Sequence, residues 1–111
     1  MGGTVMDNLS SPKEALALAV RGMASDSRGL KERLGGAYLN FHTLTSEDFP
    51  TDLLPAFHKV NALRIKADAI RGNPPEGTVK AALDAMSEKE VRAIIEAVVS
   101  LYDQVARRQP I

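Results

Sequence analysis

The C-terminal third of the chain contains the pattern that most restricts its fold. Between residues 91 and 105, apolar residues recur every three or four positions, the spacing that places side chains on one face of an α-helix. The segment Ser87-Glu88-Lys89-Glu90 precedes this pattern and matches a capping box, in which Ser and Glu three residues apart satisfy free backbone amides. Valine and isoleucine also favour strands, but a half-buried strand would alternate with a period of two. We therefore predict a long amphipathic helix with an apolar stripe of Val91, Ile94, Ile95, Val98, Leu101, Tyr102 and Val105.

Two further helices are predicted in the first part of the chain. Ser11 is expected to cap the first one, since Pro12 suits the first helical position and Glu14 completes a second capping box. The second helix is expected to follow a cap at Ser25 or Ser27. Its predicted stripe is Leu30, Leu34, Ala37, Tyr38, Phe41 and Leu44.

An acidic, turn-prone segment at residues 45–52 separates these helices from the rest of the chain. Asp52 is a good N-cap, and Pro55 would then fall in the first helical turn, where its missing N–H does no harm. The third helix is expected to run without interruption from about Leu53 to Arg71. Glycine and prolines follow it, and Thr78 is expected to cap a short fourth helix.

These elements predict an all-α fold, a compact bundle of about five helices in a single domain. The chain has 111 residues, of which 44% are hydrophobic and 25% charged, values typical of a soluble globular domain. The third and fifth helices are expected to form its centre, because their apolar residues are the most numerous. We expect a flexible N-terminal leader at residues 1–10, the helical domain at 11–108 and a flexible C-terminal end at 109–111.

The charge balance and the missing cysteines restrict the classes of function. Fourteen basic residues balance fourteen acidic ones, whereas a dedicated nucleic-acid binder usually has a basic excess. A net charge near zero also removes a barrier to self-association. There is no cysteine, no secretory signal pattern and no apolar stretch of membrane-spanning length. We therefore expect a cytoplasmic protein with no disulfides and no membrane association.

No catalytic, cofactor-binding or metal-binding residue is predicted. The two histidines, His42 and His58, lack the spacing of a zinc motif and are interpreted as helix-surface or partly buried residues. The acidic residues Glu47, Asp48 and Asp52 are interpreted as helix caps and a solvated turn. An enzyme built from these histidines and carboxylates is the third-ranked hypothesis.

The leading functional hypothesis is a non-catalytic protein–protein interaction module, either an adaptor or a small regulator, with a protein partner or a second copy of itself. Several apolar residues lie off the main stripes, where they can line a binding surface. Gly35 lies opposite the stripe of its helix and would let another helix approach closely. We expect that helix to come from this chain in preference to a partner. The candidate partner-contact residues are Leu18, Gly35, Leu39, Leu54 and Ile65.

The alternative hypothesis is a nucleic-acid-associated regulator. It would use either the basic third helix or the helix pair between Thr78 and Arg108. No row of exposed aromatic residues accompanies the basic residues, and no glycine marks a helix-turn-helix bend at Met86-Ser87. The candidate polyanion-contact residues are Lys59, Arg64, Lys66 and Arg71.

Overall fold

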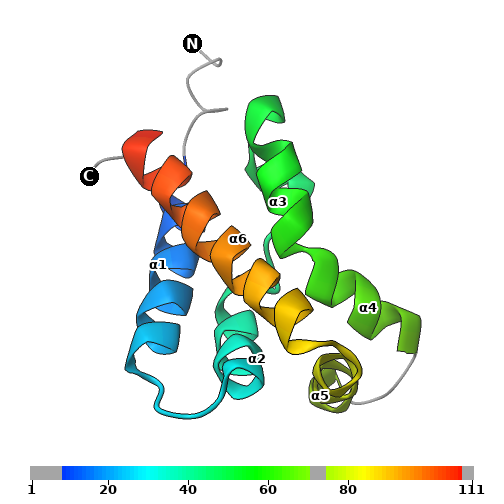
Figure 1. The fold of residues 1–111 in the computed structure, drawn as a ribbon. Helices are drawn as coiled ribbons and strands as arrows, with labels where there is room; N and C mark the ends of the chain where they lie inside the picture. Colours follow the sequence, from blue (N-terminus) through cyan, green and yellow to red (C-terminus); the bar gives the residue numbers. More distant parts are fainter. Residues whose placement is uncertain (1–8, 71–74, 109–111) are drawn as a thin grey trace.

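The computed structural model describes residues 9–70 and 75–108. All regular structure within these residues is helical, which confirms the predicted all-α, single-domain fold (Figure 1). Two short 3-10 helices, η2 and η3, stand between the second and third α-helices. The elements are α1 (Ser10–Ser25), α2 (Leu30–Phe41), η2 (Ser46–Asp48), η3 (Thr51–Leu53), α3 (Leu54–Val60), α4 (Ala62–Ile70), α5 (Pro75–Ala85) and α6 (Glu88–Arg108).

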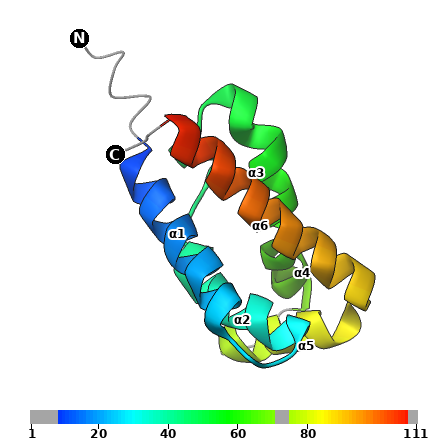
Figure 2. The ribbon, with the colours of Figure 1, turned by 60° about the vertical axis from the view of Figure 1, so that its left-hand side comes forward.

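The longest helix, α6, holds the bundle together. It crosses the front of the molecule in Figure 1 and packs against α1, α2 and α3. Helices α1 and α2 run antiparallel as a hairpin on one side of α6, while α3 lies on the other side (Figures 1 and 2). Helix α5 closes the far end of the bundle, where it contacts α4 and α2. None of the described helices is both long enough and apolar enough to cross a bilayer.

A single hydrophobic core runs through these contacts. Val91, Val98, Leu101 and Val105 of the predicted α6 stripe are fully enclosed, and Ile95 and Tyr102 of that stripe are only partly buried at its edge. Leu9, which precedes α1, also belongs to the core. The largest fully buried side chains are Leu9, Leu16, Leu34, Leu53, Leu63, Leu101, Val60, Val91, Val98 and Val105.

The predicted continuous third helix is wrong, because the chain turns at Asn61 and forms α3 and α4 in its place. The amide N–H of Asn61 donates to the Phe57 carbonyl oxygen at 2.8 Å, and its own carbonyl oxygen accepts from Ile65 N–H at 3.1 Å. Helix α3 packs against α6, whereas α4 packs against α5. The two halves therefore bury their apolar faces against different partners, and the described fold has six α-helices where about five were expected.

Two predicted N-caps in the first part of the chain are also wrong. Helix α1 begins at Ser10 after Leu9, so Ser11 lies inside the helix. Helix α2 begins after Gly29, and neither Ser25 nor Ser27 caps it. Leu9 is only 1% exposed, so the residue that precedes α1 is anchored in the core and offers no side-chain cap. Leu9 and Ser10 are the described residues of the expected leader 1–10; residues 1–8 and the expected C-terminal end at 109–111 lie outside the described residues.

The predicted capping box before α6 is confirmed. Glu90 N–H donates to Ser87 Oγ at 3.1 Å, and Ser87 N–H donates to Glu90 Oε1 at 2.9 Å. Pro55 lies in the first turn of α3, as predicted. Helix α5 begins at Pro75, three residues before the predicted cap at Thr78.

The predicted cap at Asp52 is wrong. The residue lies inside η3, and its carboxylate pairs with the guanidinium of Arg108 at the end of α6. Hydrogen bonding from Arg108 lowers the Asp52 pKa. The capping interpretation of Asp48 is confirmed, since it forms a capping box with Thr45 at the start of η2, where Thr45 N–H donates to Asp48 Oδ2 at 2.8 Å.

Candidate functional site

A groove of about 410 Å³ lies between α2 and α5. Its floor contains Gly35 and Gly36 of α2 and the buried side chains of Val79 and Leu83 of α5. Leu39 and Tyr38 line one side of it, and charged side chains stand at its edge. Its volume falls within the usual range of binding pockets, roughly 300–1,000 Å³.

Gly35 lets the two helices approach closely at the groove. A Cβ atom at Gly35 would lie 3.2 Å from Leu83 Cδ1, closer than an ordinary van der Waals contact. A Cβ at Gly36 would lie 3.6 Å from Arg28 Nη2. The helix that approaches Gly35 therefore comes from this chain, and α5 can pack directly on the α2 backbone.

Leu39 gives the groove its exposed apolar surface. The residue is 63% exposed, more than the other large apolar residues that the structure describes as exposed, which are Leu18, Ile65 and Val99. Tyr38 beside it is half-buried, and its ring meets Phe41 edge-on with centroids 5.4 Å apart. Burial raises the Tyr38 pKa. Covering Leu39 fully would gain about 1–2 kcal/mol from the apolar area removed from water.

One end of the groove is bridged by a polar contact between α2 and α5, beside an ion pair within α5. Lys31 Nζ donates to the Asp84 carbonyl oxygen at 3.4 Å, and Lys80 Nζ lies 3.2 Å from the Asp84 carboxylate. Residue Lys31 of α2 is thus level with Asp84 of α5, and Gly35 is close to Leu83. The Lys31 contact and the close approach at Gly35 both join α5 to α2 at the groove.

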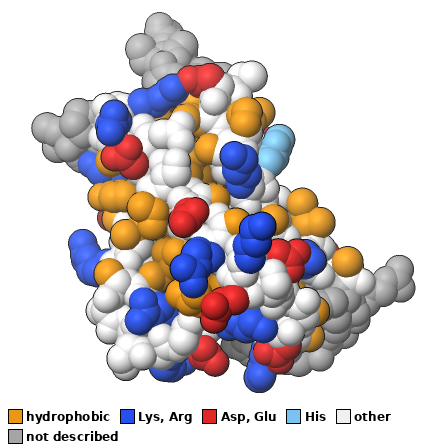
Figure 3. Space-filling model, viewed as in Figure 1, with side chains coloured by type: hydrophobic (Ala, Val, Ile, Leu, Met, Phe, Trp, Pro, Cys, Tyr) orange, Lys and Arg blue, Asp and Glu red, His pale blue; other side chains and the backbone are white. Residues whose placement is uncertain are grey.

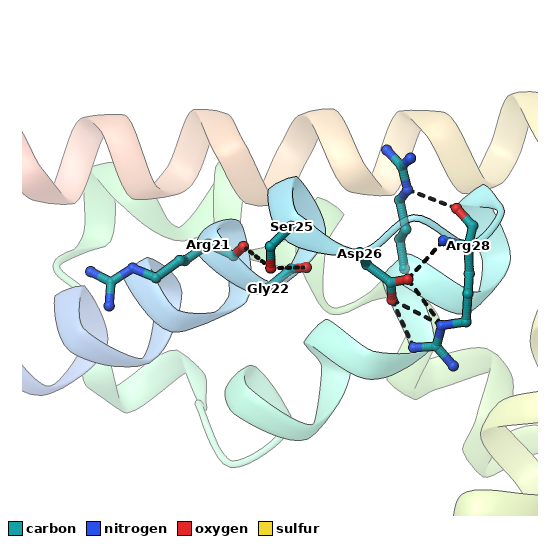
Figure 4. A network of polar contacts seen from close by, with 6 residues as sticks. Arg21, Gly22, Ser25, Asp26 and Arg28 are labelled. Carbon is teal, nitrogen blue, oxygen red and sulfur yellow. Dashed lines mark hydrogen bonds and ion pairs between the residues drawn. The ribbon is translucent and has the colours of Figure 1, made fainter.

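The turn that leads into α2 is stiffened by a second polar network (Figure 4). The Asp26 carboxylate accepts from Arg28 Nη2 at 2.7 Å, from Arg28 Nε at 2.9 Å and from the Arg28 backbone N–H at 2.8 Å. These hydrogen bonds lower the Asp26 pKa to about 2. Ser25 Oγ, which was expected to cap α2, donates instead to the carbonyl oxygens of Arg21 and Gly22. Arg28 is therefore held in place at the groove edge.

The structure brings two of the five candidate partner-contact residues together. Gly35 and Leu39 both line the groove. Leu18 on α1 and Ile65 on α4 are exposed on other helices, and Leu54 is partly buried against the core. Sequence reasoning missed Val99, which is 45% exposed on α6. The helical spacing could have identified it, because Val99 lies one turn from both Ile95 and Tyr102. Those two residues lie at the edge of the buried stripe.

The candidate polyanion-contact residues do not form a patch of unpaired cations. Arg64 Nε lies 3.8 Å from the Asp68 carboxylate, and Lys66 Nζ lies 3.8 Å from that of Glu90. Lys59 borders a second hollow between α3 and α6, of about 640 Å³. Arg71 lies outside the described residues.

The histidines and acidic residues also stay apart. His42 borders the groove beside Tyr38, with ring centroids 5.6 Å apart, while His58 is exposed on α3. Asp48 is used as a cap and Asp52 as an ion-pair partner. Within residues 9–70 and 75–108 no three His, Cys, Asp or Glu side chains converge on a point where they could hold a metal ion.

No family model, curated protein or solved structure matches this chain significantly.

Proposed function

We propose that this protein is a non-catalytic interaction module, an adaptor or small regulator, that binds a short helix of a partner protein in the groove between α2 and α5. The exposed Leu39 beside the glycine floor supports this most directly. Grooves with an apolar floor commonly receive the apolar face of an amphipathic helix. The absence of cysteine from the sequence fits a cytoplasmic setting for such a module.

The length of the groove limits the partner segment. Groove residues on and beside α2 extend from Arg28 to His42, which corresponds to roughly 20 Å of helix at a rise of about 1.5 Å per residue. A partner helix of three to four turns would fill this length. Its apolar residues should recur at the helical spacing so that they face Leu39 and the floor.

The charges at the edge favour an acidic group on the partner. Arg28 is already paired with Asp26, and Lys80 with Asp84. Lys31 reaches a backbone carbonyl oxygen of Asp84, so its ammonium group can still gain from a carboxylate. A Glu or Asp on the partner helix near Lys31 would fix the direction in which the helix lies.

The nucleic-acid hypothesis has less support, because Arg64 and Lys66 lie near carboxylates. The experiment described next distinguishes this hypothesis from the groove proposal. Binding to phosphates weakens steeply with salt, and it is lost when the nucleic acid is digested.

The test is a tagged pull-down from the native host, in nuclease-treated and untreated halves, with mass spectrometry to identify the bound proteins. Leu39→Asp should abolish binding of a stoichiometric, nuclease-resistant partner, because it places a charge in the apolar groove. Ile65→Asp is the matched control, since Ile65 is similarly exposed, at 60%, but lies on α4. A peptide copied from the captured partner should then bind the wild-type protein and not Leu39→Asp in fluorescence anisotropy.

Two results would overturn the proposal. One is a partner that Leu39→Asp retains as well as Ile65→Asp does. The other is a set of bound proteins that disappears with nuclease, which would move nucleic-acid association to first place.

A further inference from the structure

The outward side of α6 carries a second apolar surface, separate from the groove. Val99 is 45% exposed, and Ile95 and Tyr102 are partly buried one turn away on either side of it. We call these three residues the Val99 face. Helix α6 lies at the front of the molecule in Figure 1, and Figure 3 shows from the same side hydrophobic side chains over α1 and α6 among interspersed basic and acidic groups.

Charged residues stand in a definite order along α6 at both ends of the Val99 face. Near its start, Arg92 Nη2 lies 3.7 Å from Glu88 Oε1. Near its end, Arg107 Nε lies 3.1 Å from Asp103 Oδ2. In both pairs the acidic residue precedes the basic one along the helix.

This order is self-complementary for two antiparallel copies of α6. A twofold axis between Ala97 and Val98 sets Arg92 level with Asp103 of the second copy. The same axis sets Glu88 level with Arg107 of the second copy, so both pairs of opposite charges meet in one arrangement. Two parallel copies in the same register would instead set Arg92 against Arg92 and Glu88 against Glu88, which is unfavourable.

The same axis also brings apolar residues of the two copies near each other, and the residue level with Val99 itself is Glu96. Val99 then lies within one residue's rise, about 1.5 Å, of the height of Ile95 on the second copy. The 21 residues of α6 span roughly 31 Å at that rise, long enough for a helix-pair interface. Leu18, which is also exposed, lies on α1, and α1 packs against α6. With a net charge of zero, two copies have little overall repulsion to overcome.

We infer that the Val99 face binds a second copy of this chain, with the two α6 helices antiparallel. A twofold interface of this kind uses the same patch on both chains, which is the commonest form of protein dimer. This inference does not depend on the proposed groove, since α6 supplies none of the groove residues.

Sedimentation equilibrium of the full chain over a concentration series tests the dimer directly. The wild-type mass should rise from one chain to two as the concentration increases. Val99→Asp should raise the dimer dissociation constant by at least about tenfold, the effect of losing ~1.4 kcal/mol, while Ile65→Asp should leave it unchanged. A wild-type mass of one chain throughout the series, or a Val99→Asp variant that dimerises normally, would overturn the inference.

A charge exchange tests the antiparallel arrangement with variants at exposed positions only. Arg92→Asp should weaken the dimer, because the introduced carboxylate is then level with the carboxylate of Asp103 on the second copy. Adding Asp103→Arg should restore the dimer or tighten it, since each acidic half of α6 then meets a basic half. A double variant that associates more weakly than Arg92→Asp would contradict the antiparallel arrangement. Circular dichroism of each variant confirms that the monomer is folded.

Discussion

Asp26 shows how one side chain sets the geometry of the turn that leads to the groove. Its side chain is only 15% exposed and binds Arg28 through both the guanidinium group and the backbone amide. These contacts favour the charged carboxylate and hold its pKa at about 2, against an ordinary value of 3.8. The Asp26–Arg28 contact thereby fixes the entry to α2 just before its N-cap, Gly29.

We predict that Asp26 contributes to the acid sensitivity of the fold. Because its pKa is lowered in the folded state, the stabilisation is complete above about pH 4 and is lost as the pH falls towards about 2. Asp26→Asn should therefore be less stable than wild type near neutral pH and lose less stability on acidification. Urea unfolding midpoints of both proteins, measured across this pH range, test the prediction. If the midpoint changes with pH by the same amount in both proteins, the prediction is refuted.

The capping box before α6 gives a second prediction at this scale. Ser87→Ala removes the oxygen that accepts the Glu90 N–H, and loss of such a cap typically costs ~1 kcal/mol of unfolding free energy. Ser27→Ala is the control, because Ser27 is exposed between helices and caps neither α1 nor α2. Chemical denaturation should separate the two variants; equal stabilities would show that the box contributes nothing.

Individual caps were predictable from the sequence only where no distant group competed for the capping side chain. Ser87 and Glu90 bond each other, so the local motif was sufficient. Asp52 has equally good capping chemistry, but a guanidinium from Arg108, 56 residues away, takes its carboxylate. Nothing near Asp52 in the sequence signals that partner.

At the scale of elements, two glycines in neighbouring helices have opposite surroundings. A Cβ at Gly22 in α1 would meet no atom within 4 Å, whereas one at Gly35 in α2 would meet Leu83 at 3.2 Å. Both glycines weaken their helices by up to ~1 kcal/mol relative to Ala. Only Gly35 compensates for this loss, because it allows α5 to pack closely on α2.

We predict that Gly22→Ala raises the unfolding free energy by about 0.5–1 kcal/mol, since it adds helix propensity without a clash. Gly35→Ala should gain clearly less or become destabilising, because α5 must move away from α2. Thermal unfolding of both variants measures the difference, and an equal gain at the two positions would contradict the close packing at Gly35.

The helices themselves were largely predictable, since apolar periodicity reports directly which side chains are buried. The break at Asn61 was not, because apolar residues continue at helical spacing across it, from Val60 to Leu63 and Ala67. The chain bends there so that α3 can reach α6 and α4 can reach α5. Periodicity identifies a buried face but not the helix that covers it.

At the scale of the whole molecule, α6 is the helix against which α1, α2 and α3 all pack. Leu101 of α6 is fully buried in the core that these helices form. We predict that Leu101→Ala lowers the unfolding free energy by about 2–5 kcal/mol through lost contacts and the cavity left behind. Leu18→Ala, at a residue 48% exposed, should change it far less. Urea denaturation compares them, and similar losses would mean that α6 is not central to the core.

The candidate site was predictable only in part. Leu39 and Gly35 stood out because they lie off the apolar stripe of their helix. Val79 and Leu83, which meet them in the groove, are buried residues of α5. The groove exists only once α5 lies against α2, and no local pattern encodes that meeting.

The central place of α6 has a consequence for synthesis of the chain on the ribosome. Helices α1, α2 and α3 emerge before α6, yet each buries part of its apolar face against it. Until Val105 has left the exit tunnel, the apolar faces of these helices cannot be fully buried against α6. Domains generally fold as units, so we expect the nascent chain to collapse only after α6 has emerged, leaving its unfinished core available to chaperones until then.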